Sequence, residues 1–268
     1  MSANIHPTAV VESGAELGSG VVIGPFCVVG SDVTIGDNCE LLSHVVVAGR
    51  TTLGPGNKLY PFASIGHQPQ DLKYHGEPSE LVIGANNQIR EHVTMNPGTE
   101  GGGMVTKVAD NCLFMTATHV GHDCQIGNGV IMANNATLAG HVEVQDFAVL
   151  GGLSAVHQFV RIGRHSMVGG MTGVERDVIP FGSVVGDRAR LSGINLIGMK
   201  RRGFYRDAIN AVRKCYRLLF ADEGTFQERL DEVAREFADT EAVMEIVDFI
   251  RADSSRKICQ PVGNSDEL

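Results

Sequence analysis

Aliphatic residues recur at every sixth position along most of the chain. The first run has no polar member and comprises Ile5, Val11, Leu17, Ile23, Val29, Ile35, Leu41, Val47, Leu53, Leu59 and Ile65. The period resumes at Ile83 and continues, with one interruption, to Val174. A helix of 3.6 residues per turn would spread such positions around its surface, and an ordinary strand repeats every second residue. The spacing therefore predicts a repeat architecture.

Three hexads, each a short strand and a turn, close one triangular coil, and stacked coils lie about 4.8 Å apart like strands in a sheet. We therefore expect a mainly β chain with a parallel β-helix over residues 1–190. Two excursions interrupt it, near residues 66–82 and 97–107, where aliphatics are missing or the spacing between Met95 and Val108 grows to 13. Long loops in a compact repeat are more often functional than accidental.

The period changes near residue 195, where apolar residues adopt helical spacing. The first group is Ile209, Val212, Tyr216 and Leu219, and the second is Leu230, Val233, Phe237, Val243, Ile246 and Phe249. Such stripes are typical of amphipathic helices. The pattern predicts an α-helical C-terminal domain over residues 191–268.

Composition narrows the function classes. The chain has 33 glycines in 268 residues without a Gly-X-Y period, which fits frequent tight turns. A net charge of −9 argues against a general nucleic-acid binder, which needs a basic excess. No apolar run approaches the roughly 20 residues of a membrane span, and the N-terminus does not read as a secretory signal. We expect a cytoplasmic protein without stable membrane insertion.

The six cysteines contain no Cys-x-x-Cys pair, so neither a zinc knuckle nor a thioredoxin-type motif is present. Cys27, Cys39, Cys112 and Cys124 stand at the fifth position of their hexads, where small apolar residues stand elsewhere. Free cysteine behaves as a small apolar residue. We expect them to pack in the core.

Four histidines fall along one predicted edge of the coil. His122, His141 and His157 lie in hexads that start 18 residues apart, and His119 ends the preceding side. Imidazoles gathered in this way fit a metal site or an acid/base and anion-binding site, and we favour the site without metal. Asp123 follows His122 and is placed to orient it, provided that the turn brings the two side chains to the same side.

A basic segment begins the helical region. Its seven cations are Lys200, Arg201, Arg202, Arg206, Arg213, Lys214 and Arg217, against the single acid Asp207. In an acidic protein such a cluster indicates a phosphate group or an acidic partner surface, with a solvated helix face as the alternative.

These features together resemble the UDP-N-acetylglucosamine O-acyltransferase family over nearly the whole chain. The motifs that carry the resemblance are IGPFCVVG at 23–30, QDLKY at 70–74, HVGHDC at 119–124, ANNATLAGHV at 133–142, AVHQF at 155–159 and MKRRGF at 199–204. The resemblance implies a left-handed β-helix and a homotrimer with active sites between neighbouring β-helices. It also implies transfer of an (R)-3-hydroxyacyl chain from acyl carrier protein to the 3-hydroxyl of UDP-N-acetylglucosamine, the first step of lipid A biosynthesis.

The same resemblance assigns roles to individual residues. His122 would be the general base, Asp123 its partner, and the backbone N–H of Gly140 the oxyanion donor. The sugar and acyl groups would be positioned by Gln70, Asp71, Lys73, His119 and His141. Gln158 would line the acyl site, and the nucleotide end would be served by His157, Asn195, Arg201 and Arg202. The carrier protein would meet Lys200, Arg206, Arg213, Lys214 and Arg217. No cofactor is implied, because the donor chain is carried on the phosphopantetheine of the carrier protein.

The acyl ruler of the family maps to Met167 and Gly170. Because glycine leaves the tunnel open there, we expect a chain of about C12 to C14. Three positions depart from the family pattern: Asn96, Arg188 and Ile197. They leave a 3-amino sugar acceptor open.

Three other functions compete with this interpretation. The N-acyltransferase of the same pathway carries a separate N-terminal uridine-binding domain, whereas the hexads here begin at Ile5. An acetyl-coenzyme A-dependent hexapeptide acetyltransferase would not explain the loop and MKRRGF motifs. A non-catalytic trimeric scaffold would need neither the histidine edge nor the two excursions.

Overall fold

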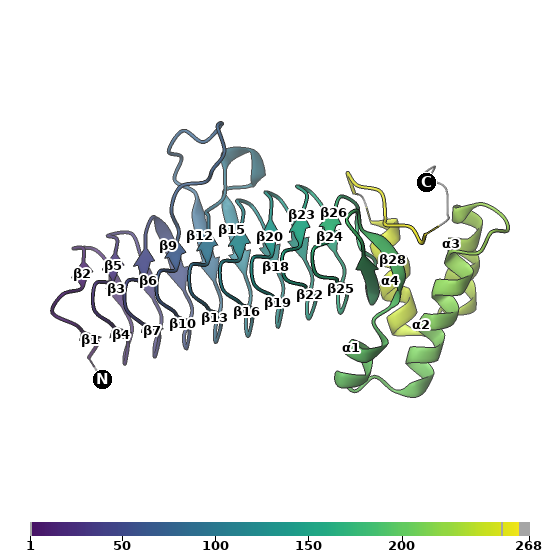
Figure 1. The fold of residues 1–268 in the computed structure, drawn as a ribbon, viewed down its shortest axis with the longest axis horizontal. Helices are drawn as coiled ribbons and strands as arrows, with labels where there is room; N and C mark the ends of the chain where they lie inside the picture. Colours follow the sequence, from purple (N-terminus) through teal and green to yellow (C-terminus); the bar gives the residue numbers. More distant parts are fainter. Residues whose placement is uncertain (1, 253, 263–268) are drawn as a thin grey trace.

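The computed structural model describes residues 2–252 and 254–262 and forms a long triangular prism with helices at its C-terminal end (Figure 1). The prism is a left-handed parallel β-helix, as the hexads and the family resemblance together predict. Residue 1 of the predicted β-helix and residues 253 and 263–268 of the predicted C-terminal domain lie outside the described residues.

Three sheets, here called A, B and C, form the sides of the prism. Sheet A contains β1 (Asn4–Ile5), β4 (Val22–Ile23), β7 (Glu40–Leu41), β10 (Lys58–Leu59), β13 (Gln88–Ile89), β16 (Leu113–Phe114), β19 (Ile131–Met132), β22 (Val149–Leu150), β25 (Met167–Val168), β27 (Gly182–Val185) and β28 (Arg190–Ile194). Sheet B contains β2 (Val10–Val11), β5 (Val28–Val29), β8 (Val46–Val47), β11 (Ser64–Ile65), β14 (Thr94–Met95), β17 (His119–Val120), β20 (Thr137–Leu138), β23 (Ala155–Val156) and β26 (Gly173–Val174). Sheet C contains β3 (Glu16–Leu17), β6 (Thr34–Ile35), β9 (Arg50–Leu53), β12 (Glu80–Ile83), β15 (Val105–Val108), β18 (Gln125–Ile126), β21 (Glu143–Val144) and β24 (Arg161–Ile162).

The repeating aliphatic of each hexad points into the prism. Stacked positions are 18 residues apart, as in the Val29–Val47 pair of β5 and β8. From Ile23 to Val174 these side chains are buried, whereas Ile5 in the first coil is 42% exposed because no coil lies beneath it. Each buried Val, Leu or Ile contributes about 1.5–3 kcal/mol through removal of apolar surface from water. All six cysteines are buried free thiols, as predicted for the four in the hexads.

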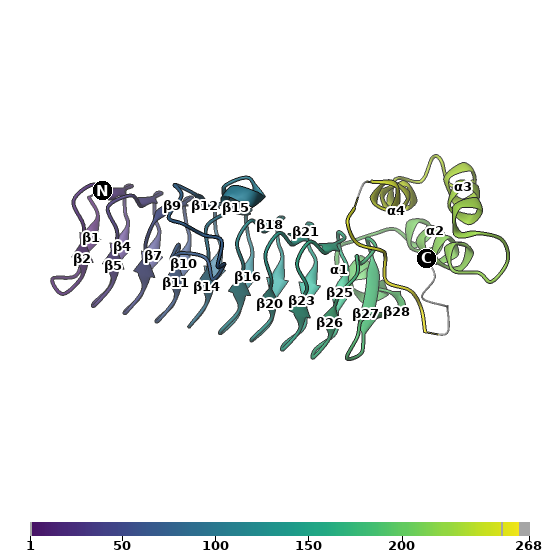
Figure 2. The same cartoon turned by 90° about the horizontal axis from the view of Figure 1, so that it is seen from above.

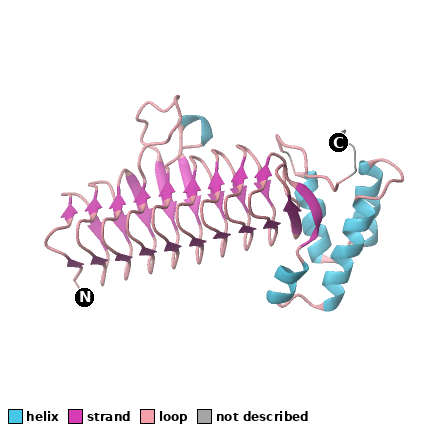
Figure 3. Cartoon of the chain, viewed as in Figure 1, coloured by secondary structure: helices cyan, strands magenta, loops and turns pink. Residues whose placement is uncertain are grey.

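Both excursions leave the same edge of the prism in successive coils. The first follows β11 and the second follows β14, so each runs from sheet B to sheet C. Together they protrude from one side of the prism (Figure 1), and the second contains the short 3₁₀ helix η1 (Glu100–Gly102), drawn in cyan in Figure 3. We call this line of turns the B/C edge.

Among the residues that the structure describes, four α-helices follow the β-helix: α1 (Leu196–Arg201), α2 (Arg206–Leu219), α3 (Phe226–Glu236) and α4 (Glu241–Arg251). The expected domain boundary at residue 191 falls inside the antiparallel β27–β28 pair, which covers the last coil. Residues 254–262 then return to the prism (Figure 2), where Ile258 bridges Asp177 and Pro261 bridges Leu191. The end of the chain is thereby attached to the final coil.

The corner residue of most hexads adopts a left-handed backbone. In the described part of the chain, eighteen residues other than glycine have positive φ, among them Asp123, His141, Phe159 and His165. This conformation costs roughly 1–2 kcal/mol for an L-residue. Ring stacking between successive coils offsets part of the cost, as between His165 and its neighbours Phe147 and Phe181, whose ring centroids lie 5.1 and 5.5 Å away.

Burial of His165 makes stability dependent on pH. Removal of the ring from water, together with the nearby Arg164 and Arg202, lowers the pKa of His165 from 6.5 to about 4. The unfolded chain therefore binds this proton more readily, so stability falls as pH drops below 6.5 towards 4. We expect the free energy of unfolding to lose about 2 kcal/mol between pH 7 and pH 5 from this residue.

The measurement is urea denaturation at both pH values and fixed protein concentration, for the parent and for H165F. Phenylalanine suits the aromatic column, and the buried Nε2 of His165 has no hydrogen-bond partner to lose. Between pH 7 and pH 5, the free energy of unfolding of H165F should fall by about 2 kcal/mol less than that of the parent. An unchanged difference between the two pH values would contradict the prediction.

Candidate active site

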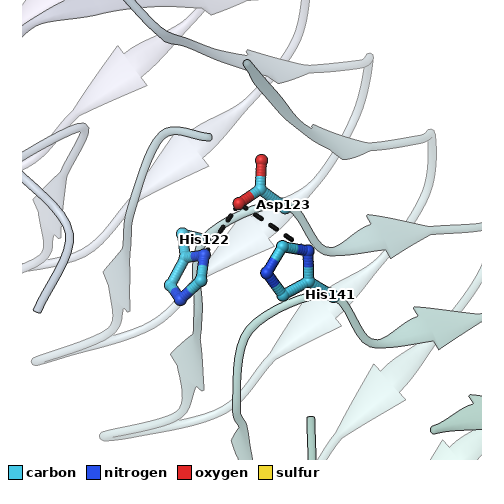
Figure 4. A group of neighbouring side chains, drawn as sticks. All are labelled: His122, Asp123 and His141. Atoms are coloured by element: carbon cyan, nitrogen blue, oxygen red, sulfur yellow. Dashed lines mark hydrogen bonds and ion pairs between the residues drawn. The ribbon is translucent and has the colours of Figure 1, made fainter. Parts of the chain in front are cut away.

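His122 and Asp123 lie at a turn of the B/C edge, one coil beyond the second excursion. The left-handed φ of 60° at Asp123 turns its side chain towards that of its neighbour. Nδ1 of His122 lies 2.7 Å from Oδ2 of Asp123 (Figure 4). The turn therefore brings together two adjacent side chains that a flat strand would point to opposite sides.

The hydrogen bond determines which nitrogen of His122 can accept a proton. An ionised carboxylate only accepts hydrogen bonds, so Nδ1 carries the hydrogen and donates it to Asp123. In the neutral ring, Nε2 is then unprotonated. Oδ2 of Asp71, on the first excursion, lies 4.0 Å from this Nε2, which is too long for a hydrogen bond.

Gly140 lies against the other side of the His122 ring. A Cβ atom at position 140 would come within 2.4 Å of both Cε1 and Nε2 of His122. Among the hydrogen bonds of the described turns, the N–H of Gly140 has no acceptor. The site thus packs Gly140, whose N–H is without an acceptor among these bonds, against an unprotonated imidazole nitrogen.

His141 occupies the next coil of the same edge. Its ring meets that of His122 edge-on at 4.9 Å and stacks on Phe159 at 4.4 Å. Burial is the main cause that lowers the pKa of His141, and it likewise lowers that of His119, whose Nδ1 lies 2.7 Å from Oγ1 of Thr94. These shifts favour neutral rings that can hydrogen-bond uncharged groups.

Of the four histidines that the sequence placed along one edge, the structure brings only some into contact with one another. His122 and His141 touch, but the next ring in contact with His141 is Phe159 and not His157. His157 is exposed, and its Nδ1 lies 2.8 Å from Nη2 of Arg256. The sequence pattern did not indicate Arg256, because this residue comes from a segment about a hundred positions away with no local motif.

His122, Asp123 and His141 also satisfy the distance requirement for a metal site, since one ligand atom from each lies within 4.8 Å of the others. Yet Oδ2 of Asp123 accepts hydrogen bonds from His122 and from Oγ1 of Thr99 at 2.6 Å. Both of its lone pairs are therefore engaged. The geometry favours a hydrogen-bonded pair, and the absence of a metal stays a prediction.

The remaining predicted residues lie on several parts of the prism. Gln70 and Lys73 are exposed on the first excursion, near Asp71, and Gln158 is exposed beside His157. Met167 lies in β25, and Gly170 follows at the edge between sheets A and B. A single chain does not bring these two residues to the turn that carries His122.

The nucleotide-end candidates surround α1. Asn195 caps this helix by accepting from the N–H of Gly198 and donates to the carbonyl of His165, so the fold already uses both ends of its amide. Arg202 stacks its guanidinium over Phe147 at 4.1 Å, and Arg201 is exposed.

The candidate carrier-protein surface runs along α2. Lys200 lies at the end of α1, and Arg206, Arg213, Lys214 and Arg217 are all exposed. Lys214 pairs with Glu236 of α3, so it also joins two helices. Among the described residues, Arg206, Arg213 and Arg217 have no carboxylate partner.

The three departures from the family pattern have separate structural roles. Asn96 is buried and donates to the carbonyls of His67 and Gln68 at the base of the first excursion. Arg188 pairs with Glu175, and Ile197 is 66% exposed on α1. Asn96 therefore supports the loop that carries Asp71.

Comparison with known proteins connects this geometry to a family. The family model described as "Udp N-acetylglucosamine O-acyltransferase; Domain 2" matches residues 177–259, and that for "Bacterial transferase hexapeptide (six repeats)" matches residues 14–49 and 106–140. Two curated relatives are named acyl-[acyl-carrier-protein]--UDP-N-acetylglucosamine O-acyltransferase. The protein from Caulobacter vibrioides is 54% identical over 96% of this chain and 98% of its own, and that from Rhizobium johnstonii is 50% identical over 97% and 96%.

Solved structures agree in fold. The UDP-N-acetylglucosamine acyltransferase from Campylobacter jejuni superposes with a TM-score of 0.90 at 38% identity, covering 96% of this chain and 99% of its own.

Proposed function

The chain belongs to the UDP-N-acetylglucosamine O-acyltransferase family, and from this membership we infer that it moves an (R)-3-hydroxyacyl chain from acyl carrier protein to the 3-hydroxyl of UDP-N-acetylglucosamine. This reaction is the first step of lipid A biosynthesis. The observation that best supports a chemical role for this site is the pairing of His122 with Asp123, which leaves Nε2 of His122 free and packed against Gly140.

We propose that His122 is the general base. Its Nε2 takes the proton of the sugar 3-hydroxyl as the oxygen attacks the thioester carbonyl, and Asp123 stabilises the imidazolium that forms. The N–H of Gly140 donates to the developing oxyanion. When the C–S bond breaks, the departing thiolate of the phosphopantetheine arm recovers the proton from His122. No further cofactor is required.

We propose that the active unit is a homotrimer. The base lies on the B/C edge, the ruler candidates Met167 and Gly170 lie on or beside sheet A, and Arg202 covers Phe147 at the remaining edge. One prism cannot direct three edges into one cleft. A neighbouring copy therefore supplies the groups that this chain places elsewhere. The sugar and acyl groups are positioned by Gln70, Asp71, Lys73, His119 and His141.

The basic surface of α2 suits the acidic carrier protein, because Arg206, Arg213 and Arg217 project from exposed positions. His157, Asn195, Arg201 and Arg202 serve the nucleotide end, and Gln158 lines the acyl site. Among the described residues, no helix is both long enough and apolar enough to cross a bilayer. We place the reaction in the cytoplasm, where six unpaired buried thiols are the usual state of cysteine.

The experiment that tests this function is a mass-spectrometric transfer assay. It offers UDP-N-acetylglucosamine and its 3-amino analogue with (R)-3-hydroxyacyl carrier proteins of C10, C12 and C14. We expect an ester on UDP-N-acetylglucosamine, formed fastest from the longer donors because Gly170 adds no side chain to the ruler. A G170M variant should shift the preference towards C10, since its side chain would shorten the tunnel.

A preference for C10 in the parent enzyme would contradict the ruler. Product on the amino analogue alone would leave the role of His122 as the base intact and make the 3-amino sugar the acceptor. No product with either sugar would favour the non-catalytic trimeric scaffold.

A further inference from the structure

Thr99, on the second excursion, contacts both oxygens of the Asp123 carboxylate. Its backbone N–H donates to Oδ1 at 2.9 Å, and its hydroxyl donates to Oδ2 at 2.6 Å. Thr99 is 5% exposed and the side chain of Asp123 is fully buried, so water does not compete for these bonds. Hydrogen bonds to a buried charged group are among the stronger ones in proteins.

The excursion is shaped around this carboxylate. A Cβ atom at Gly102 would lie 2.0 Å from Cγ of Asp123, and one at Gly98 would lie 2.8 Å from Oδ1. From the opposite side, the hydroxyl of Thr106 accepts the N–H of Asp123 at 2.7 Å. Glycines at these positions thus let the loop backbone enclose Asp123.

The hydroxyl of Thr99 is used in an unusual way. Thr99 is the N-cap of η1, where a threonine hydroxyl commonly accepts from the helix backbone, but no such cap bond forms here. The hydroxyl instead donates to the carboxylate oxygen that also accepts from His122. A series of hydrogen bonds therefore links Thr99 on the excursion, through Asp123, to the ring of His122, whose Nε2 the reaction uses.

We propose that Thr99 is a positioning residue for catalysis, acting through Asp123 on His122. The two bonds from Thr99 prevent rotation of the carboxylate and aim the second lone pair of Oδ2 at Nδ1–H of His122. That bond holds the imidazole in the tautomer with a free Nε2. The proposal rests on the proposed role of His122, and it gives the second excursion a function that the sequence left unassigned.

Two substitutions at Thr99 test the role of the hydroxyl. T99V removes the donor but preserves volume, and valine suits the extended backbone at this position, with φ −131° and ψ 162°. We expect T99V to lower kcat about 10-fold with little change in KM for UDP-N-acetylglucosamine, because the base is misplaced while the binding groups remain. T99S keeps the hydroxyl and should retain most of the activity.

A double-mutant cycle separates positioning from simple stability. If Thr99 acts through Asp123, T99V should change kcat less than about twofold in a D123A background. T225V is the matched control: Thr225 caps α3 through its hydroxyl, so its loss should lower the melting temperature without lowering kcat.

Two results would overturn the proposal. One is an equal fold-loss of kcat from T99V in the parent and in the D123A background. The other is parent-like activity of T99V when the separate variant H122A is inactive. If H122A itself remained active, the role of the base would fail first, and the two failures are thereby distinguished.

Discussion

H122A should abolish nearly all acyl transfer, with kcat reduced about 10²- to 10⁴-fold, the usual contribution of a general base. The physical reason is that the bond to Asp123 occupies Nδ1 of His122 and leaves Nε2 unprotonated to accept the proton, at a point where a Cβ on Gly140 would lie within 2.4 Å. The measurement is the initial rate with saturating sugar nucleotide and acyl carrier protein. The oligomeric state and melting temperature should change little, because His122 is partly exposed at a turn and lies outside the hexad core.

H6A is the control for H122A, since His6 lies in the first coil, where its Nδ1 is 3.0 Å from Oγ1 of Thr8. It should retain full activity. If H122A kept more than about a tenth of the parent rate, His122 would not be the general base.

G140A is expected to produce the second large loss, about 100-fold in kcat, because small displacements of reacting groups carry costs of this size. Its Cβ would overlap the Cε1 and Nε2 atoms of His122, so the ring must move away from the oxyanion donor. Gly140 is not among the glycines with positive φ, so alanine fits the backbone. We therefore expect kcat of the variant to fall about 100-fold while its melting temperature changes little.

The control for G140A is G101A, on the second excursion, where an added Cβ would meet no atom within 4 Å. This variant should keep the parent rate. Parent-like activity in G140A would show that His122 is not confined by the Gly140 backbone as the structure indicates.

The period-six pattern determined most of the fold, because a hexad contains both its core residue and its turn. Counting predicted that hexads 18 residues apart stack in parallel, and the structure confirms this stacking, with excursions where the period breaks. Counting in steps of 18 also placed His122 and His141 on one edge, where their rings are in contact. The handedness of the coil came from the family resemblance, because spacing is the same for either hand.

The side-chain partners were decided only by the tertiary structure. The sequence placed Asp123 to orient His122 only if the turn brought the two side chains to the same side, and the left-handed corner at Asp123 meets that condition. Phe159 replaced His157 as the neighbour of His141 because the corner position, and not the residue type, sets which rings stack.

Contacts between distant segments carry no periodic signal at all. Thr99 reaches Asp123 from a loop 24 residues earlier, and Arg256 reaches His157 from a segment 99 residues later. The sequence by itself therefore determined the prism and the edge that carries the base. The tertiary structure decided which groups orient that base, because irregular loops choose their contacts only once the regular coils have placed the surfaces that they meet.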